Sequence, residues 1–178
     1  MPGPSDWITR WAGLIAPGGT VLDLACGSGR HLRWLASQGL RVTGVDRNAE
    51  ALAPLASLAE VRVVDLEDGP WPLVGRRFDA VVVTNYLWRP RFGDLLTLLA
   101  DDGVLLYETF ADGNAALGRP ARPEFLLRRG ELLGLCAGLR IVAFEEGRLD
   151  DPPRCVQRIA ALGPQERPDR IVRLKEGP

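Results

Sequence analysis

Three aspartates and two glycines stand at the ends of short apolar runs in the first part of the chain. Asp23 precedes a turn that contains Gly27 and Gly29, and Asp46 and Asp65 close the next two apolar runs. Glycines allow backbone N–H groups to approach a ligand closely, so this turn could cradle a small molecule. A carboxylate beside the cradle would repel a pyrophosphate but would attract an ammonium or a sulfonium group. The residue types therefore predict a ligand that bears positive charge.

The spacing of these residues argues against a nicotinamide dinucleotide as that ligand. A dinucleotide fingerprint needs G-x-G-x-x-G, but Leu32 stands three positions after Gly29, where the third glycine would pack the helix on its strand. Asp46 follows Gly29 by seventeen positions, where an acid can accept both hydroxyl hydrogens of a ribose. An NAD-dependent oxidoreductase stays an alternative that Leu32 and the charge of Asp23 disfavour.

The segments around these residues alternate between strand and helix patterns. Ser5 can N-cap a first helix whose apolar residues recur at three-and-four spacing, and Pro17, Gly18 and Gly19 end it. Strands are expected at residues 20–25, 41–46, 61–64, 78–84, 104–110, 139–147 and 154–162. Further helices are expected at residues 30–38, 48–58, 92–100 and 124–136, with a long loop at 111–123 that could serve as a lid.

This order predicts an α/β fold, a Rossmann-like three-layer αβα sandwich. Alternating strands and helices produce a parallel sheet, and the last two strands, with no helix between them, form a hairpin. We expect a mostly parallel seven-stranded sheet with an antiparallel C-terminal hairpin strand. It would form a single domain over residues 1–178, with an N-terminal flap helix in 1–19 and a C-terminal tail at 163–178. Open α/β sheets bind ligands beyond the carboxyl ends of their strands, where the three aspartates would meet.

The motif series D-L-A-C-G-S-G-R-H, V-D and V-D-L-E resembles motifs I to III of class I S-adenosylmethionine-dependent methyltransferases. The resemblance covers roughly the whole chain and is nearest to the small tellurite-resistance and ubiquinone-biosynthesis-like group, although many relatives have glycine in place of Ala25. It implies S-adenosylmethionine as cofactor and S-adenosylhomocysteine as product. It implies contacts of Asp23, Ala25, Gly27 and Gly29 with the methionine moiety, of Asp46 and Arg47 with the ribose, of Asp65 and Leu66 with the adenine, and of Asn85 after the fourth strand. Cys26 and His31, in the same turn, complete the expected cofactor residues.

Four residues are candidates for catalysis: Tyr86, Tyr107, Glu108 and His31. Tyr86 follows the central strand, where Trp88 and Arg89 could also contact an acceptor or simply pack the loop. Tyr107 and Glu108 end the fifth strand and could orient or deprotonate an acceptor, or make only strand-end hydrogen bonds. His31 has an ordinary pKa near neutrality and could act as a general base, but a place beside the cofactor is its more ordinary role. A dedicated base is not required, because a sulfonium methyl group is already activated.

Composition and charge narrow the partners. The 178 residues have a formal net charge of −1, which gives no overall attraction for nucleic acid, and the sequence Asn-Tyr-Leu-Trp lacks the proline pair of amine methylases that act on bases. The three cysteines have no metal-ligand spacing, so neither a metal nor a disulfide is expected. Neither a membrane span nor a secretory signal is indicated, so we expect a cytoplasmic monomer or homodimer. The expected function is in-line transfer of a methyl group to a small-molecule acceptor, and the alternative is a non-catalytic S-adenosylmethionine-binding sensor or partner subunit.

Overall fold

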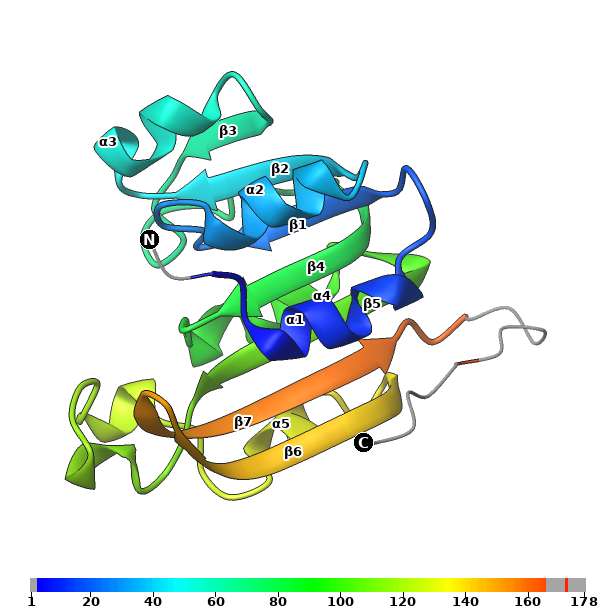
Figure 1. Ribbon diagram of the computed structural model, residues 1–178. Helices are drawn as coiled ribbons and strands as arrows, with labels where there is room; N and C mark the ends of the chain where they lie inside the picture. Colours follow the sequence, from blue (N-terminus) through cyan, green and yellow to red (C-terminus); the bar gives the residue numbers. More distant parts are fainter. Residues whose placement is uncertain (1–2, 166–171, 173–178) are drawn as a thin grey trace.

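A sheet of seven strands organises the computed structural model, which describes residues 3–165 and 172 (Figure 1). The strands are β1 (Thr20–Leu24), β2 (Arg41–Asp46), β3 (Glu60–Val63), β4 (Phe78–Thr84), β5 (Leu99–Phe110), β6 (Arg140–Asp150) and β7 (Pro153–Leu162). Their order across the sheet is β3-β2-β1-β4-β5-β7-β6. The pairs from β3 to β5 are parallel, whereas β7 is antiparallel to both β5 and β6. The predicted mostly parallel sheet with an antiparallel hairpin strand is confirmed.

Helices cover both faces of this sheet (Figure 1). On one face lie α1 (Asp6–Trp11), α2 (Arg30–Ser37) and α3 (Ala49–Leu52), which share a core cluster with Val82 of β4. On the other face lie α4 (Phe92–Leu96) and α5 (Glu131–Leu135), which pack around Leu105 and Tyr107 of β5. Within the described part of the chain, five short 3-10 turns join these elements: η1 (Ala12–Leu14), η2 (Ala53–Leu55), η3 (Arg89–Arg91), η4 (Asn114–Ala116) and η5 (Pro123–Phe125). The predicted three-layer arrangement is confirmed.

Alternation of side chains along β5 decides which residues can meet at the site. Successive side chains of a strand point to opposite faces. Leu106 belongs to the core cluster beneath α1, while Leu105 and Tyr107 belong to the cluster beneath α4 and α5. Glu108, one residue further on, contacts Ser5 at the start of α1. Tyr107 and Glu108 therefore serve opposite faces of the sheet, although they are neighbours in sequence.

Helical structure is present where the N-terminal flap helix was predicted, as α1 and η1, and its role as a flap stays a prediction. Ser5 caps α1, because its side-chain oxygen accepts a hydrogen bond from the backbone N–H of Trp7. Trp7, Ile8 and Trp11 are buried against the sheet, so this short helix is held by packing. Residues 1–2 of the predicted flap and residues 166–171 and 173–178 of the predicted tail lie outside the described residues.

Three predicted helices are shorter in the structure than the sequence pattern indicated. The helix expected at 48–58 is α3 followed by η2, where Pro54 removes a backbone N–H donor. The helix expected at 92–100 ends at Leu96, because the chain enters β5 at Leu99, five residues before the predicted strand. The helix expected at 124–136 is reduced to α5, since Gly130 adopts a φ of 63°, which a right-handed helix does not contain.

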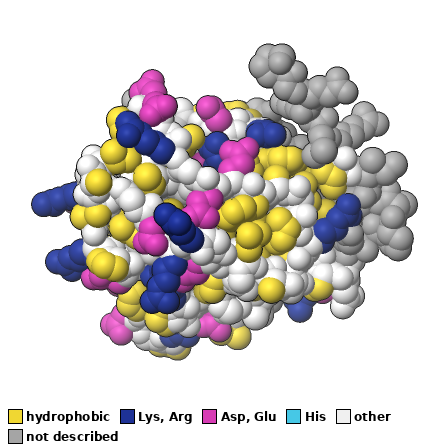
Figure 2. Space-filling view, turned by 90° about the horizontal axis from the view of Figure 1, so that it is seen from below, with side chains coloured by type: hydrophobic (Ala, Val, Ile, Leu, Met, Phe, Trp, Pro, Cys, Tyr) yellow, Lys and Arg dark blue, Asp and Glu magenta, His cyan; other side chains and the backbone are white. Residues whose placement is uncertain are grey.

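β6 forms one edge of the sheet and is the lowest strand in Figure 1. Viewed from this side, Figure 2 shows acidic and basic side chains interspersed with apolar ones. Glu145 pairs with Arg10 and Arg158, and Arg148 pairs with Asp150. Charged side chains on an edge strand oppose pairing with further chains. Among the described residues, no helix is long and apolar enough to cross a membrane.

Candidate cofactor and acceptor site

A cleft of about 230 Å³ lies at the carboxyl ends of β1 to β4. The residues that line it are Ala25, Asp46, Arg47, Val64, Asp65, Leu66, Glu67, Asn85 and Tyr86. The parallel order of these strands brings segments that are far apart in sequence to one edge of the sheet. The cleft thus unites six of the predicted cofactor residues with the acceptor candidate Tyr86. Val64 and Glu67, which the sequence reasoning missed, flank the motif residues Asp65 and Leu66 directly.

The glycine turn between β1 and α2 is shaped for close approach of a ligand. Gly27 and Gly29 both have positive φ, at 54° and 74°. A Cβ atom at Gly29 would come within 2.5 Å of Leu55, so a larger residue would displace that packed side chain. A Cβ atom at Gly27 would meet nothing within 4 Å, so the backbone there is open to a ligand. Gly27 satisfies the need for a bare backbone at the cradle, and Gly29 satisfies a packing need.

The carboxylates of Asp46 and Asp65 are both oriented by backbone N–H groups. Asp46 accepts hydrogen bonds from Gly27 at 2.8 Å and Asn48 at 2.9 Å, one on each oxygen. Asp65 is exposed and accepts one from Glu67 at 2.8 Å. Each carboxylate oxygen has a second lone pair, so both side chains can still accept hydrogens from a ligand. Hydroxyls of a ribose and an exocyclic amine are donors of the kind that these positions fit.

Asp23 lies beneath the turn and has an unsatisfied oxygen. Its side chain is 1% exposed, and Oδ2 accepts a hydrogen bond from the backbone N–H of Leu32 at 2.9 Å. Oδ1 is buried and has no hydrogen-bond partner among the described residues. Burial raises the pKa of Asp23 to about 7, against the opposing effects of the Leu32 hydrogen bond and the charge of Arg30. A cationic ligand at the turn would satisfy this carboxylate and lower its pKa, which fits the charge of S-adenosylmethionine.

Two residues that line the cleft have strained backbones. Ala25 and Asn85 each have a φ of 55°, and they are the non-glycine residues with positive φ in the described part of the chain. Asn tolerates this left-handed region, whereas Ala pays a steric cost there. Strain of this kind gathers at ligand-binding sites, because the surrounding structure must enforce it. Both residues follow directly on strand ends, where the chain has to turn around the ligand.

Tyr86 lines the cleft, and its hydroxyl group has no hydrogen-bond partner among the described residues. The hydroxyl oxygen is buried. Burial raises the pKa of Tyr86, and the neighbouring charges of Glu67 and Asp65 raise it further. The group is therefore a neutral phenol at physiological pH, able to donate a hydrogen bond to a bound molecule rather than to act as a base.

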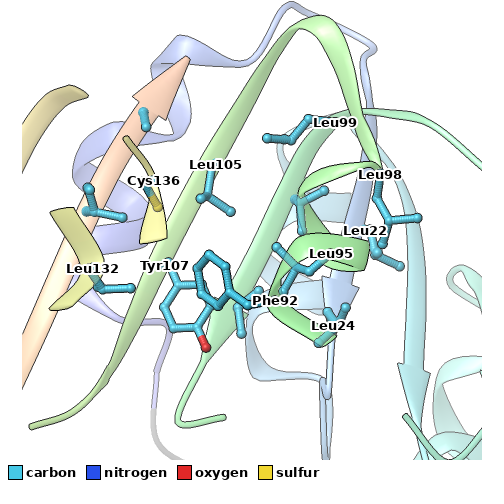
Figure 3. Close-up of a cluster of buried hydrophobic side chains, with 14 of the residues drawn as sticks. Leu22, Leu24, Phe92, Leu95, Leu98, Leu99, Leu105, Tyr107, Leu132 and Cys136 are labelled. Carbon is cyan, nitrogen blue, oxygen red and sulfur yellow. The ribbon is translucent and has the colours of Figure 1, made fainter. Parts of the chain in front are cut away.

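Tyr107 lies in the hydrophobic core and does not line the cleft (Figure 3). Its ring is 1% exposed and lies 5.5 Å from that of Phe92, centroid to centroid. Its hydroxyl donates a hydrogen bond to the backbone carbonyl of Tyr86 at 2.6 Å. Burial holds the pKa of Tyr107 far above its ordinary value. The structure thus places Tyr107 as a support for the Tyr86 segment, away from the cleft that the sequence reasoning expected it to face.

His31 and Glu108 are brought together beneath the start of α1. His31 Nε2 accepts from the backbone N–H of Ser5 at 3.1 Å, and Nδ1 lies 3.2 Å from Thr84 Oγ1. Glu108 accepts from Ser5 Oγ at 3.0 Å and contacts Arg158 at 3.3 Å. Burial, together with the charge of Arg30, lowers the pKa of His31 to about 4. His31 is therefore neutral at physiological pH, with both nitrogens in internal contacts.

Two further candidates also have internal roles. Cys26 is buried in the core beneath α2, and burial raises the pKa of its thiol well above the ordinary value. The Arg89 guanidinium donates hydrogen bonds to Glu131 at 2.6 Å and to the backbone carbonyls of Glu124 and Leu126. These bonds hold the loop before α5 in place. No group of three or more His, Cys, Asp or Glu side chains among residues 3–165 could hold a metal ion.

Comparison with known proteins agrees with the motifs and the fold. Residues 21–103 match the family model of a methyltransferase domain. YqeM of Bacillus subtilis, named as a candidate methyltransferase, is 32% identical over 119 residues, which are 59% of this chain and 48% of that protein. The chain spans about half the length, or less, of the curated relatives that it matches.

Solved structures share the fold at low sequence identity. TehB from Haemophilus influenzae aligns with a TM-score of 0.73 and 20% identity, over 90% of this chain and 62% of that chain. The cyclase SpnF aligns with a TM-score of 0.66 and 16% identity, over 89% and 79% of the two chains. The domain match over residues 21–103, the motif series and the strand order are thus similar to those of S-adenosylmethionine-dependent methyltransferases of class I, and the solved structures share their fold.

Proposed function

We propose that this protein transfers a methyl group from S-adenosylmethionine to a small-molecule acceptor by in-line displacement. The observation that supports it best is the cleft across the ends of β1 to β4, where Asp46 and Asp65 are oriented beside the open backbone of Gly27. Asp46 and Arg47 would hold the ribose, and Asp65 and Leu66 the adenine. The methionine moiety would lie over Ala25 and the glycine turn, with its positive charge toward Asp23.

The bound cofactor would supply an electrophilic methyl group, whose bond to sulfur breaks as the bond to the acceptor forms. The task of the protein is then to hold the acceptor in line and to exclude water. Asn85 and Tyr86 follow β4, next to the place where the methyl group would emerge. The Tyr86 hydroxyl can donate a hydrogen bond there, and Tyr107 fixes the Tyr86 backbone from below.

A second candidate function is a non-catalytic sensor or partner subunit that binds the cofactor. Three of the four candidate catalytic side chains, Tyr107, Glu108 and His31, are buried and engaged in internal contacts. The fold is also shared by the cyclase SpnF, so fold alone does not establish methyl transfer. This observation keeps the sensor as the competing proposal.

Titration calorimetry with S-adenosylmethionine, S-adenosylhomocysteine and NAD tests the foundation of both proposals. We expect binding of the first two and none of NAD, and the reverse pattern would overturn the site proposed here. Incubation with S-adenosylmethionine and a panel of metabolites then separates enzyme from sensor. An enzyme forms S-adenosylhomocysteine with at least one acceptor, whereas a sensor consumes none. Four further expectations stay predictions: a single domain over residues 1–178, a cytoplasmic location, a monomer or homodimer, and the lack of a nucleic-acid partner.

A further inference from the structure

A second polar cluster lies under the residues that precede α1, apart from the residues that line the cofactor cleft. Its members are His31 from α2, Thr84 from β4, Glu108 from β5 and Arg158 from β7. Ser5 closes the cluster from outside and is itself only 7% exposed. We call the site formed by His31, Thr84, Glu108 and Arg158, which Ser5 covers, the Ser5 chamber.

The chamber stands where an acceptor would be needed. In the proposed function, the adenine lies over β3 and the methionine moiety over β1, so the cofactor runs along the carboxyl edge toward β4 and β5. Thr84 of the chamber directly precedes Asn85, which lines the cofactor cleft. Glu108 pairs with Thr84 across the parallel strands β4 and β5. The next position along the edge beyond the cofactor is therefore the chamber.

The contacts of Ser5 show what kind of group the chamber accepts. Its backbone N–H donates to His31 Nε2, and its hydroxyl donates to Glu108 Oε1. Because Nε2 is an acceptor, the neutral imidazole holds its proton on Nδ1 and donates it to Thr84. Arg158 pairs with the other oxygen of Glu108 at 3.3 Å. Two acceptors, one on an imidazole and one on a carboxylate, thus converge on two neighbouring donors.

Burial of these groups has a cost that packing alone does not explain. The strands bury mostly apolar side chains, with a few polar ones such as Asp23 and Gln157, and here His31 and Glu108 are each 1% exposed. Buried polar groups destabilise a fold unless each one is hydrogen-bonded, and Ser5 supplies those bonds in the closed state. Trp7 and Trp11 anchor α1 independently, so only residues 3–5 need to move for the chamber to open.

We propose that the Ser5 chamber is the acceptor subsite and that residues 3–5 are a lid whose Ser5 donors the acceptor replaces. The inference rests on the proposed function and deepens it by naming the substrate class. The acceptor carries two neighbouring hydrogen-bond donors, such as an amine beside a hydroxyl group. Glu108 and His31 act in this subsite as specificity-determining residues.

The chain offers a direct reporter for this proposal, because His31 is its single histidine. The test follows the imidazole nitrogen signals of His31 by NMR in protein saturated with S-adenosylhomocysteine, during titration with ethanolamine. Tetramethylammonium is the matched control, since it has a similar charge and no N–H or O–H donor. We expect a saturable shift of the Nε2 signal with ethanolamine and none with tetramethylammonium.

Two variants separate the lid from the helix that follows it. Ser5→Gly removes the competing hydroxyl at little cost to the N-cap, so ethanolamine should bind several-fold tighter than to the unaltered protein. Thr9→Ala removes a hydroxyl of α1 that contacts only its own helix, and it should leave ethanolamine binding unchanged. If ethanolamine shifts the His31 signals in neither the unaltered protein nor Ser5→Gly, with S-adenosylhomocysteine bound, the proposal that the chamber is the acceptor subsite is wrong. The proposed function would still stand. Failure of S-adenosylhomocysteine to bind at all would overturn both.

Discussion

The carboxylate of Asp46 accepts a hydrogen bond from the backbone N–H of Gly27 at 2.8 Å, so the end of β2 holds the glycine turn that follows β1. The second oxygen of Asp46 accepts from Asn48, the N-cap residue of α3. One side chain therefore orients the turn, the start of a helix and the ribose position of the cleft. Charge-assisted bonds of this type are stronger than neutral ones, which makes the arrangement rigid.

Replacement of Asp46 by Ala should weaken S-adenosylhomocysteine binding by about ten-fold or more, which corresponds to about 1.4 kcal/mol. The variant loses the carboxylate that would accept the ribose hydroxyls and also the bond that holds Gly27. Calorimetric titration measures the effect. Asp101→Ala is a matched control, because Asp101 is also paired, with Arg77, but does not line the cofactor cleft. Equal affinity in both variants would remove Asp46 from the ribose site.

Binding of the cofactor should release a proton from Asp23 near neutral pH. The pKa of Asp23 is about 7 without ligand, because burial disfavours the charged form, and a bound cation would lower it. Below pH 7 the protein must then lose this proton, so the affinity for S-adenosylmethionine rises as the pH increases toward 7. Calorimetry at pH 6 in two buffers of different ionisation enthalpy counts the protons. Asp23→Asn should abolish the release, and an identical heat in both buffers for the unaltered protein would contradict the assignment.

Stability should depend on pH in opposite directions through Asp23 and His31. For Asp23 the folded-state pKa lies above its ordinary value of 3.8, so its contribution to the free energy of unfolding falls as pH rises from about 4 to 7. For His31 the folded-state pKa of about 4 lies below 6.5, so its contribution is lost as pH falls from 6.5 to 4. Urea unfolding of Asp23→Asn and His31→Gln between pH 4 and 8 isolates the two effects. Parallel pH profiles for both variants and the unaltered protein would refute them.

The sequence predicted the fold better than it predicted the surroundings of the catalytic candidates. Periodicity and turn residues located all seven strands, because β-branched runs and glycine turns act locally. Asp46 and Asp65 line one cleft, since parallel strands end at the same edge, whereas Asp23 is buried and does not line it. The sequence could indicate only that Tyr107 and Glu108 lie on opposite faces of the sheet, because side chains alternate along a strand. The face of the sheet that α1 covers depends on the tertiary packing of Trp7 and Trp11. No local sequence pattern indicates that face.

Replacement of Tyr107 by Phe should change stability more than cofactor binding. The hydroxyl makes one buried hydrogen bond, to the carbonyl of Tyr86, so its loss should cost about 1 to 2 kcal/mol of unfolding free energy. The ring and its packing on Phe92 stay in place. Urea unfolding and S-adenosylhomocysteine titration measure the two quantities, with Tyr86→Phe as the matched variant that removes an unpartnered hydroxyl. A stability of Tyr107→Phe equal to that of the unaltered protein would contradict the supporting role.

Replacement of Ala25 by Gly should stabilise the folded protein, against the usual direction for that change. Ala25 has a φ of 55°, and the left-handed conformation costs an L-residue about 1 to 2 kcal/mol that glycine avoids. Glycine gives back about 0.4 to 1 kcal/mol through the greater freedom of the unfolded chain. The expected net gain is therefore about 0.5 to 1 kcal/mol in urea unfolding. Ala36→Gly, the same change within α2, should instead cost about 1 kcal/mol, because Ala36 lies in a right-handed helix. Destabilisation by both changes would show that the strain at Ala25 is absent, and that the turn beneath the cofactor does not need a glycine-like backbone.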